Sequence, residues 1–199
     1  MTGIGRIVDR LATTMALIGG TVLSALILLT CASIIGRLLN GALHGSVLQS
    51  VAPGFAERML DWGIGPITGD FELVEAGIAF AIFAFLPLCQ IRAGHATVDV
   101  FTANLPGGIQ RWLRAVVEVV FALVLILICW RLGDGTLSKL QYGETTFLLQ
   151  MPIWWAYAAS FVASIVAVIA GIYMAVIRVT EAVTGQIIQP AGTEAEQPQ

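Results

Sequence analysis

Four long apolar stretches constrain the fold of this chain more than any other feature of its sequence. The first lies between Arg10 and Arg37 and contains 26 residues without a charge. An α-helix needs ~20 apolar residues to cross a hydrocarbon core about 30 Å thick, so this stretch is long enough to span a membrane. It also exceeds the ~7–15 apolar residues of a secretory signal, and we expect an uncleaved transmembrane helix.

The composition indicates a chain that meets lipid rather than water. Of its 199 residues, 57% are hydrophobic and only 12% are charged, and the mean hydropathy is +0.86. Soluble domains use about 45–50% apolar and ~25% charged residues, so this chain lacks the charges to build a polar shell. The net charge is −3. Without a basic stripe, nucleic acid is excluded as a partner.

We therefore expect an all-α integral membrane protein with four transmembrane helices. The membrane domain covers residues 1–184, and residues 185–199 are expected to form a disordered tail. The predicted spans cover residues 11–35, 71–91, 113–133 and 152–177.

The start of the last span is predicted from its length. The uncharged stretch from Thr145 to Ile177 contains 33 residues, which would form a helix ~50 Å long. Fitting that helix into the hydrocarbon core would need a tilt beyond the usual range of about 0–40°. We therefore expect the helix to begin at Pro152, because proline is favoured in the first turn.

Charged residues within the predicted spans lie near the span ends. Glu72 and Glu75 fall in the first turns of the second span, where carboxylates favour the positive end of the helix dipole. Asp70, just before them, is expected to cap that helix. In the third span, Arg114 and Glu118 stand four residues apart, so we expect an ion pair on one helix face.

Four spans place both termini on the same side of the membrane, and the basic residues indicate which side. Six arginines flank the terminal side: Arg6, Arg10, Arg92, Arg111, Arg114 and Arg178. Four basic residues flank the other side: Arg37, Arg58, Arg131 and Lys139. Because cytoplasmic loops carry the excess of Lys and Arg, both termini are expected in the cytoplasm. The first outer loop is expected to hold a short amphipathic surface helix over residues 53–62.

Small residues repeat every four positions along the last span. This small-residue ridge consists of Ala159, Ala163, Ala167, Gly171 and Ala175. Small side chains let helix backbones approach closely in lipid. We therefore expect the ridge to face another span of this chain or a partner protein.

No residue pattern indicates an enzyme or a cofactor site. The three cysteines lie in apolar stretches and are odd in number, which fits packing rather than a disulfide framework or a metal site. His44 and His95 both fall outside the predicted spans, so the spans offer no haem ligand. His95 and Asp99 are too few for a metal site, and we expect them to orient the inner loop or to contact a partner.

A set of polar, glycine and proline residues marks the ends of the spans in a characteristic order. The set comprises Arg37 and Asn40 after the first span, Glu72 and Glu75 opening the second, Arg92, Gly94, His95 and Asp99 after it, Leu105 and Pro106, Gly133 and Gly135 closing the third, Gly143 to Thr146, and Pro152 and Trp154 opening the fourth. In this order the chain resembles the small permease (Q) subunit of TRAP (tripartite ATP-independent periplasmic) transporters. The resemblance covers residues 6–180, with residues 42–66 as an insertion relative to shorter members.

The resemblance implies one part of a three-part secondary importer in the bacterial inner membrane. A periplasmic binding (P) protein would capture an organic acid, and a large membrane (M) subunit would move it with sodium. This small subunit would scaffold the large one, with the M subunit, the P protein and membrane lipid as partners. A translocating unit needs ionisable groups near the midplane and paired broken helices, and this sequence shows neither.

A small self-sufficient proton-coupled transporter remains as the alternative. In that hypothesis Glu118, near the inner end of the third span, would carry the proton. An Arg114 to Glu118 pair needs no such role.

The predicted topology can be tested by cysteine labelling in intact cells. In a variant without the native cysteines, we expect an impermeant maleimide to label a cysteine placed at Glu57 and to spare one placed at Thr2. The reverse pattern would contradict cytoplasmic termini.

Overall fold

A computed structural model of the chain describes residues 3–45, 53–61, 63, 65–92 and 107–185. Within these residues the chain is helical, and its only extended pairing is an isolated antiparallel bridge between Thr145 and Pro152. The helices are α1 (Gly3–Leu43), α3 (Pro53–Asp61), α4 (Asp70–Ile91), α5 (Gly107–Tyr142) and α6 (Trp154–Thr184). Four of them, all except α3, are long and apolar enough to cross a membrane, which confirms the predicted all-α membrane fold.

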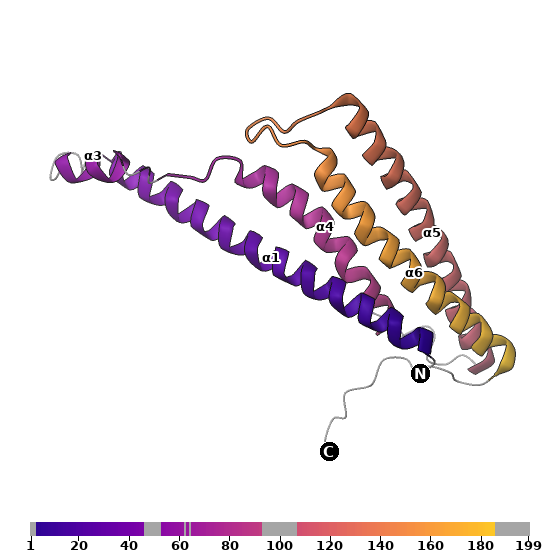
Figure 1. Ribbon diagram of the computed structural model, residues 1–199. Helices are drawn as coiled ribbons and strands as arrows, with labels where there is room; N and C mark the ends of the chain where they lie inside the picture. Colours follow the sequence, from indigo (N-terminus) through magenta and orange to yellow (C-terminus); the bar gives the residue numbers. More distant parts are fainter. Residues whose placement is uncertain (1–2, 46–52, 62, 64, 93–106, 186–199) are drawn as a thin grey trace, which may run out of the picture.

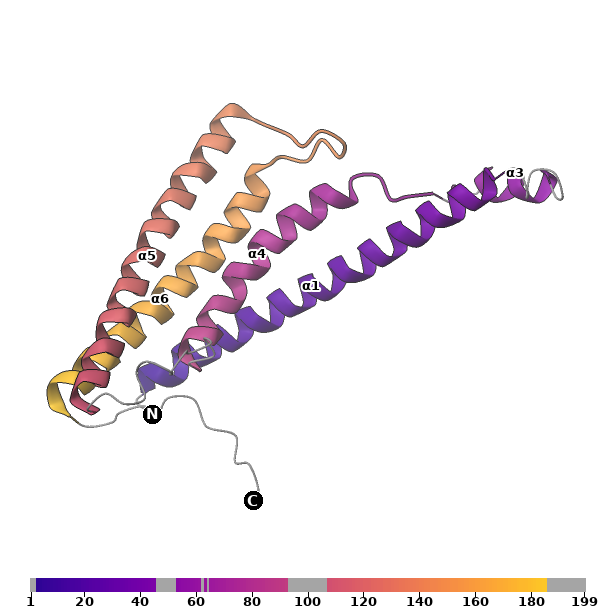
Figure 2. The same cartoon turned by 180° about the vertical axis from the view of Figure 1, so that it is seen from behind.

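The four long helices form an open bundle rather than a closed one. α4 packs against both α1 and α6, and α5 packs against α6 (Figure 1). Figures 1 and 2 show α1 and α5 close together at one end of the bundle and far apart at the other. We call the end at which α4 and α6 begin the outer end, after the predicted orientation, and the opposite end the inner end.

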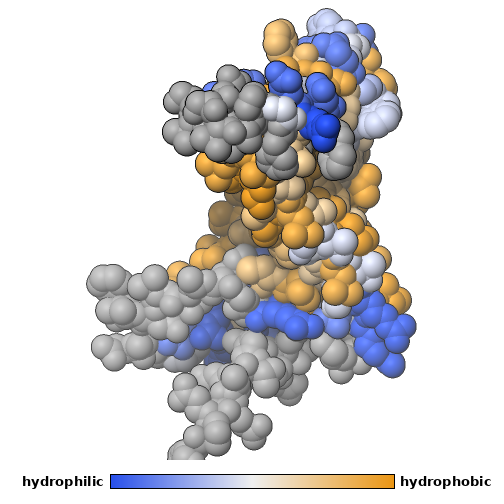
Figure 3. Space-filling model, turned by 90° about the vertical axis from the view of Figure 1, so that its left-hand side faces the viewer, coloured by the Kyte–Doolittle hydropathy of each residue, from blue (hydrophilic) through white to orange (hydrophobic). Residues whose placement is uncertain are grey.

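A cluster of buried apolar residues lies at the inner end. It joins residues from α1, α4 and α6: Val8, Ala12, Ile91, Ala170 and Met174. Most large apolar side chains elsewhere are exposed, and Figure 3 shows them as a continuous apolar band between two polar ends. This inverted distribution is expected where lipid rather than water surrounds the helices.

Two helices extend well beyond the predicted spans. α1 has 41 residues and α5 has 36, so at 1.5 Å per residue α1 is ~60 Å long. Gly133 and Gly135, which we expect to close the third span, do not end its helix, because α5 continues through both to Tyr142. A Cβ at Gly133 would lie 3.0 Å from the ring of Phe161, and one at Gly135 would lie 3.1 Å from the ring of Tyr157. These two glycines therefore make room for aromatic rings of α6 and do not end a helix.

The other two transmembrane helices begin close to the predicted limits, and α4 also ends at the predicted Ile91, whereas α6 continues to Thr184. α4 begins at Asp70, and α6 begins at Trp154, two residues after Pro152. α3 begins at Pro53, with Met59 half-buried and the charged Glu57 exposed. The predicted disordered tail lies, from residue 186 onward, outside the described residues.

The small-residue ridge of α6 is mostly buried inside the chain. Ala163 and Ala167 are at most 1% exposed, and Gly171 and Ala175 are also buried. Ala159, in contrast, is exposed. A spacing of four residues drifts ~40° per step around a helix with 3.6 residues per turn. The outer member of the ridge therefore turns away from the face that the inner members share.

We expect Gly171→Leu to destabilise the bundle. A Cβ at Gly171 would lie 3.0 Å from Leu125 Cδ1 and 3.7 Å from Ala122 Cα of α5, so a larger side chain forces α5 and α6 apart. The free energy of unfolding should fall by about 1–3 kcal/mol, measured by thermal unfolding of the purified protein. Ile169→Leu on the exposed face of α6 is the control. Equal stability of the two variants would show that α5 and α6 do not pack closely at Gly171.

Candidate functional site

The carboxylate of Glu72, in the first turn of α4, holds the loop between α5 and α6. Its Oε1 accepts a hydrogen bond from the backbone N–H of Leu148 at 2.7 Å, and its Oε2 accepts one from Leu149 at 3.0 Å. Two successive backbone donors on one carboxylate make a charge-assisted, bidentate contact. The contact fixes the loop across the outer end of α4.

The loop itself is ordered by a dense set of local hydrogen bonds. Thr146 N donates to Met151 O at 2.8 Å, and Ile153 N donates to Glu144 O at 3.0 Å. Gly143, which the family resemblance singles out, leaves α5 with a φ of +61°, a left-handed conformation that glycine adopts without steric cost. The loop is therefore a rigid structure.

A second carboxylate in the same turn of α4, that of Asp70, faces α1 instead of the loop. Asp70 Oδ2 accepts a hydrogen bond from Ser33 Oγ of α1 at 2.5 Å and lies 3.4 Å from Arg37 Nη2. The Arg37 guanidinium also lies 5.7 Å from the centroid of the Phe71 ring, within the range of a cation–π contact. The predicted capping role of Asp70 is wrong, because Gly69 holds the cap position and no side chain caps the helix.

At the inner end, a polar contact links α4 and α5. Gln90, which is buried, donates a hydrogen bond from Nε2 to Glu118 Oε2. Glu118 thereby contacts the inner end of α4, where burial favours a partner for each polar group. The ion pair between Arg114 and Glu118 stays a prediction.

α6 carries a buried ion pair at the same end of the bundle. Arg178 Nη1 lies 2.7 Å from Glu181 Oε2, and each side chain is only 8% exposed. Removing either partner would leave an uncompensated buried charge. Both residues lie just beyond the last predicted span, within the part of α6 that extends past residue 177.

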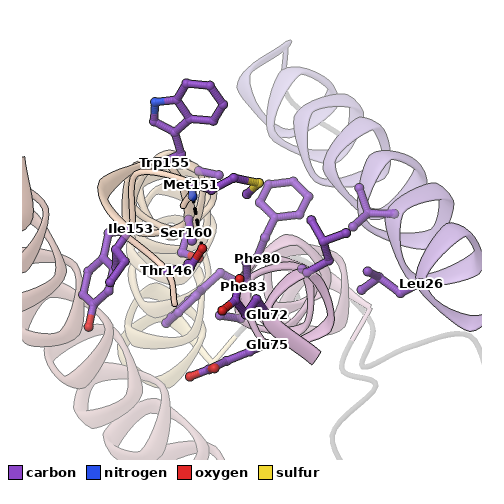
Figure 4. A pocket seen from close by; sticks show the side chains of 18 of the residues that line it. Leu26, Glu72, Glu75, Phe80, Phe83, Thr146, Met151, Ile153, Trp155 and Ser160 are labelled. Carbon is purple, nitrogen blue, oxygen red and sulfur yellow. Dashed lines mark hydrogen bonds between the residues drawn. The ribbon is translucent and has the colours of Figure 1, made fainter. Parts of the chain in front are cut away.

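An apolar pocket of about 860 Å³ lies under the α5–α6 loop, between the outer parts of α4 and α6. Figure 4 shows the Phe80 ring beside the Met151 side chain within it. Leu26 of α1 lines one side, and the Glu75 carboxylate lies on the side of α4 remote from α1 (Figure 4). The pocket is thus an outer-end feature built from residues of α1, α4, α5 and α6 and of the loop.

The remaining predicted residues fall into separate places. Pro152 pairs with Thr145 in the bridge that closes the loop, and Arg92 is an exposed residue at the end of α4. His95 and Asp99 lie outside the described residues. In the part of the chain that the structure describes, no group of three His, Cys, Asp or Glu side chains could hold a metal ion.

Sequence reasoning missed most of the partners in these contacts. Ser33 and Gln90 carry no signal of their own in an apolar stretch, although each is a polar residue within a helix and buried in the fold. A polar side chain at hydrocarbon depth needs a partner. That rule could have flagged both residues without naming the partner.

A scan against protein families matches residues 26–181 to the DctQ component of tripartite ATP-independent periplasmic transporters. The chain belongs to the DctQ family. Comparisons with curated proteins and with solved structures found no match. The predicted family is therefore confirmed, and this DctQ-family chain is a small, multi-pass membrane component of such a transporter.

We expect Glu72→Ala to release the α5–α6 loop of this DctQ-family protein. Without the carboxylate, the N–H groups of Leu148 and Leu149 lose their acceptor, so their amides should exchange faster with solvent. Hydrogen exchange followed by mass spectrometry checks this, with Glu75→Ala as the matched control, because Glu75 makes no contact with the loop among the described hydrogen bonds. Unchanged exchange in Glu72→Ala would show that the loop is held by other contacts.

Proposed function

We propose that this chain scaffolds the large permease subunit of a TRAP transporter in sodium-coupled, binding-protein-dependent uptake of an organic acid. The observation that carries the proposal is family membership over residues 26–181. The proposed site is the bacterial inner membrane, with both termini in the cytoplasm, where six of the ten basic residues would lie.

The distribution of charge supports a scaffold rather than a substrate carrier. No Asp, Glu, Lys or Arg occurs from residue 11 to 36, from 76 to 91, from 119 to 130 or from 145 to 177. An organic anion crossing ~30 Å of hydrocarbon must exchange its hydration for dipoles or cations of the protein. The middle of each helix offers no charged group for this exchange.

The charged groups at the ends of the helices support the same proposal. Asp70 binds Ser33 of α1, and Glu72 binds backbone groups of the α5–α6 loop, so these carboxylates hold the outer ends of the helices in place. When access to the substrate site alternates between the two sides of the membrane, the moving part of a transporter shifts against a part that stays fixed. A bundle with fixed ends meets that requirement.

We expect reconstituted transport to need this chain and the large subunit together. Liposomes would contain this chain alone, the large subunit alone, or both, with the binding protein, a labelled organic acid and a sodium gradient. Uptake should occur only with both subunits. Flux driven by sodium or by protons through this chain alone would overturn the scaffold proposal.

Glu118→Gln separates the scaffold from the alternative proton carrier. The amide keeps an oxygen that can accept the hydrogen bond from Gln90, but it cannot titrate. For a scaffold, we expect uptake by the complete assembly within about twofold of the unchanged protein. Loss of uptake with intact assembly on a sizing column would favour the proton carrier.

A further inference from the structure

The apolar pocket under the α5–α6 loop has two polar groups without a partner. Ser160 is 2% exposed, and its Oγ is buried without a hydrogen-bond partner. Glu75 is exposed and makes no hydrogen bond or ion pair among the described residues. Both residues line the pocket.

Ser160 differs from other hydroxyl residues of the transmembrane helices in its hydrogen bonding. Thr21, Thr30 and Thr136 each donate to the carbonyl four residues before them, at 2.7–2.9 Å. Ser164, four residues after Ser160, donates to Phe161 O at 2.7 Å. A buried hydroxyl without a bond loses its hydration and gains nothing in return, so Ser160 marks a place where a partner from outside the chain is needed.

The depth of Glu75 indicates the chemistry of the ligand. Glu75 lies five residues into α4, which is ~7.5 Å along the helix, and Ser160 lies six residues into α6, ~9 Å along it. The headgroup layer on each side of the hydrocarbon core is only about 5–8 Å thick. If both helices begin at the membrane surface, both groups lie near the boundary between headgroups and acyl chains, where a carboxylate needs a cation.

We propose that this pocket binds a phospholipid with a primary-amine headgroup, such as phosphatidylethanolamine. The ammonium group donates to the Glu75 carboxylate, and one acyl chain lies in the apolar interior beside Phe80 and Phe83. The Ser160 hydroxyl donates to an ester oxygen of the lipid. A volume of about 860 Å³ falls within the range of ligand pockets, about 300–1,000 Å³.

The roof of the pocket favours a lipid over a helix of another protein. Thr146 and Met151 of the α5–α6 loop line the pocket, and Glu72 holds that loop in place. A helix is about 10–12 Å across with its side chains and would have to displace the loop. A flexible acyl chain can enter beside it.

The test measures lipid retained by the purified full-length chain in nanodiscs of equal parts phosphatidylethanolamine, phosphatidylcholine and phosphatidylglycerol. Native mass spectrometry after mild release counts the bound lipids. We expect phosphatidylethanolamine to exceed phosphatidylcholine by about fivefold, the effect of one partly solvated charge contact. Choline is also a cation, but it has no N–H to donate.

Four variants connect this preference to the pocket. Glu75→Gln should abolish the preference, whereas Glu57→Gln on α3 should keep it, because Glu57 lies outside the pocket. Ser160→Ala should reduce retention without loss of thermal stability, since it removes an unbonded hydroxyl. Ala159→Phe should fill the pocket and reduce retention of every lipid.

Any of three results would overturn the proposal. Equal retention of the two zwitterionic lipids by the unchanged protein, or an unchanged preference in Glu75→Gln, would show that the pocket does not select an amine. A photo-crosslinker at Ala79 that captures the co-expressed large subunit instead of lipid would show that a protein occupies the pocket. The lipid assay uses this chain alone, so its failure leaves the transport proposal untouched.

Discussion

Two carboxylates in the first turn of α4 hold the outer end of the bundle together. Asp70 and Glu72 are separated by one residue, so their side chains leave the helix ~200° apart. One reaches Ser33 and Arg37 of α1, and the other reaches the loop between α5 and α6. Because the helices diverge toward this end (Figure 1), apolar packing alone would leave the outer ends loosely joined. The two polar contacts therefore join the outer ends of the helices where apolar packing is sparse.

Packing in the interior follows from the lipid solvent. Leucine side chains gain little by leaving lipid tails for one another, so close contact needs small residues. α6 supplies them on the faces toward α4 and α5, where Ala163, Ala167 and Ala170 are at most 1% exposed. α6 is consequently the most buried of the four transmembrane helices. α1 and α5 keep most of their apolar surface for lipid or for a partner.

The division between polar ends and an apolar middle suits a subunit that holds another in place. Polar contacts at the outer end fix α4 against α1 and the loop, and Gln90 with Glu118 joins α4 to α5 at the inner end. The pocket between α4 and α6 leaves these helices partly separated near the outer end of the bundle. A lipid bound there would fill the space between these helices and would add to the rigidity of the bundle.

The sequence by itself determined the number of membrane helices, their approximate positions and the family. These properties depend on local composition, because ~20 apolar residues must cross the membrane as a helix whatever lies beside them. Charge did not indicate where the helices themselves end. α5 runs on to Tyr142, since a helix can continue beyond the hydrocarbon core, and Gly133 contacts a ring of α6 rather than ending α5.

Only the tertiary structure decided which polar residues meet. Glu118 binds Gln90, 28 positions earlier, and Glu72 binds backbone groups 76 and 77 positions later. Such partners depend on how helices far apart in the chain are rotated and placed, which periodicity within one helix does not encode. Backbone N–H groups carry no residue-specific signal at all. Local composition therefore determined the number and approximate positions of the membrane helices, whereas the placement of the helices in space determined the contacts that fix their ends.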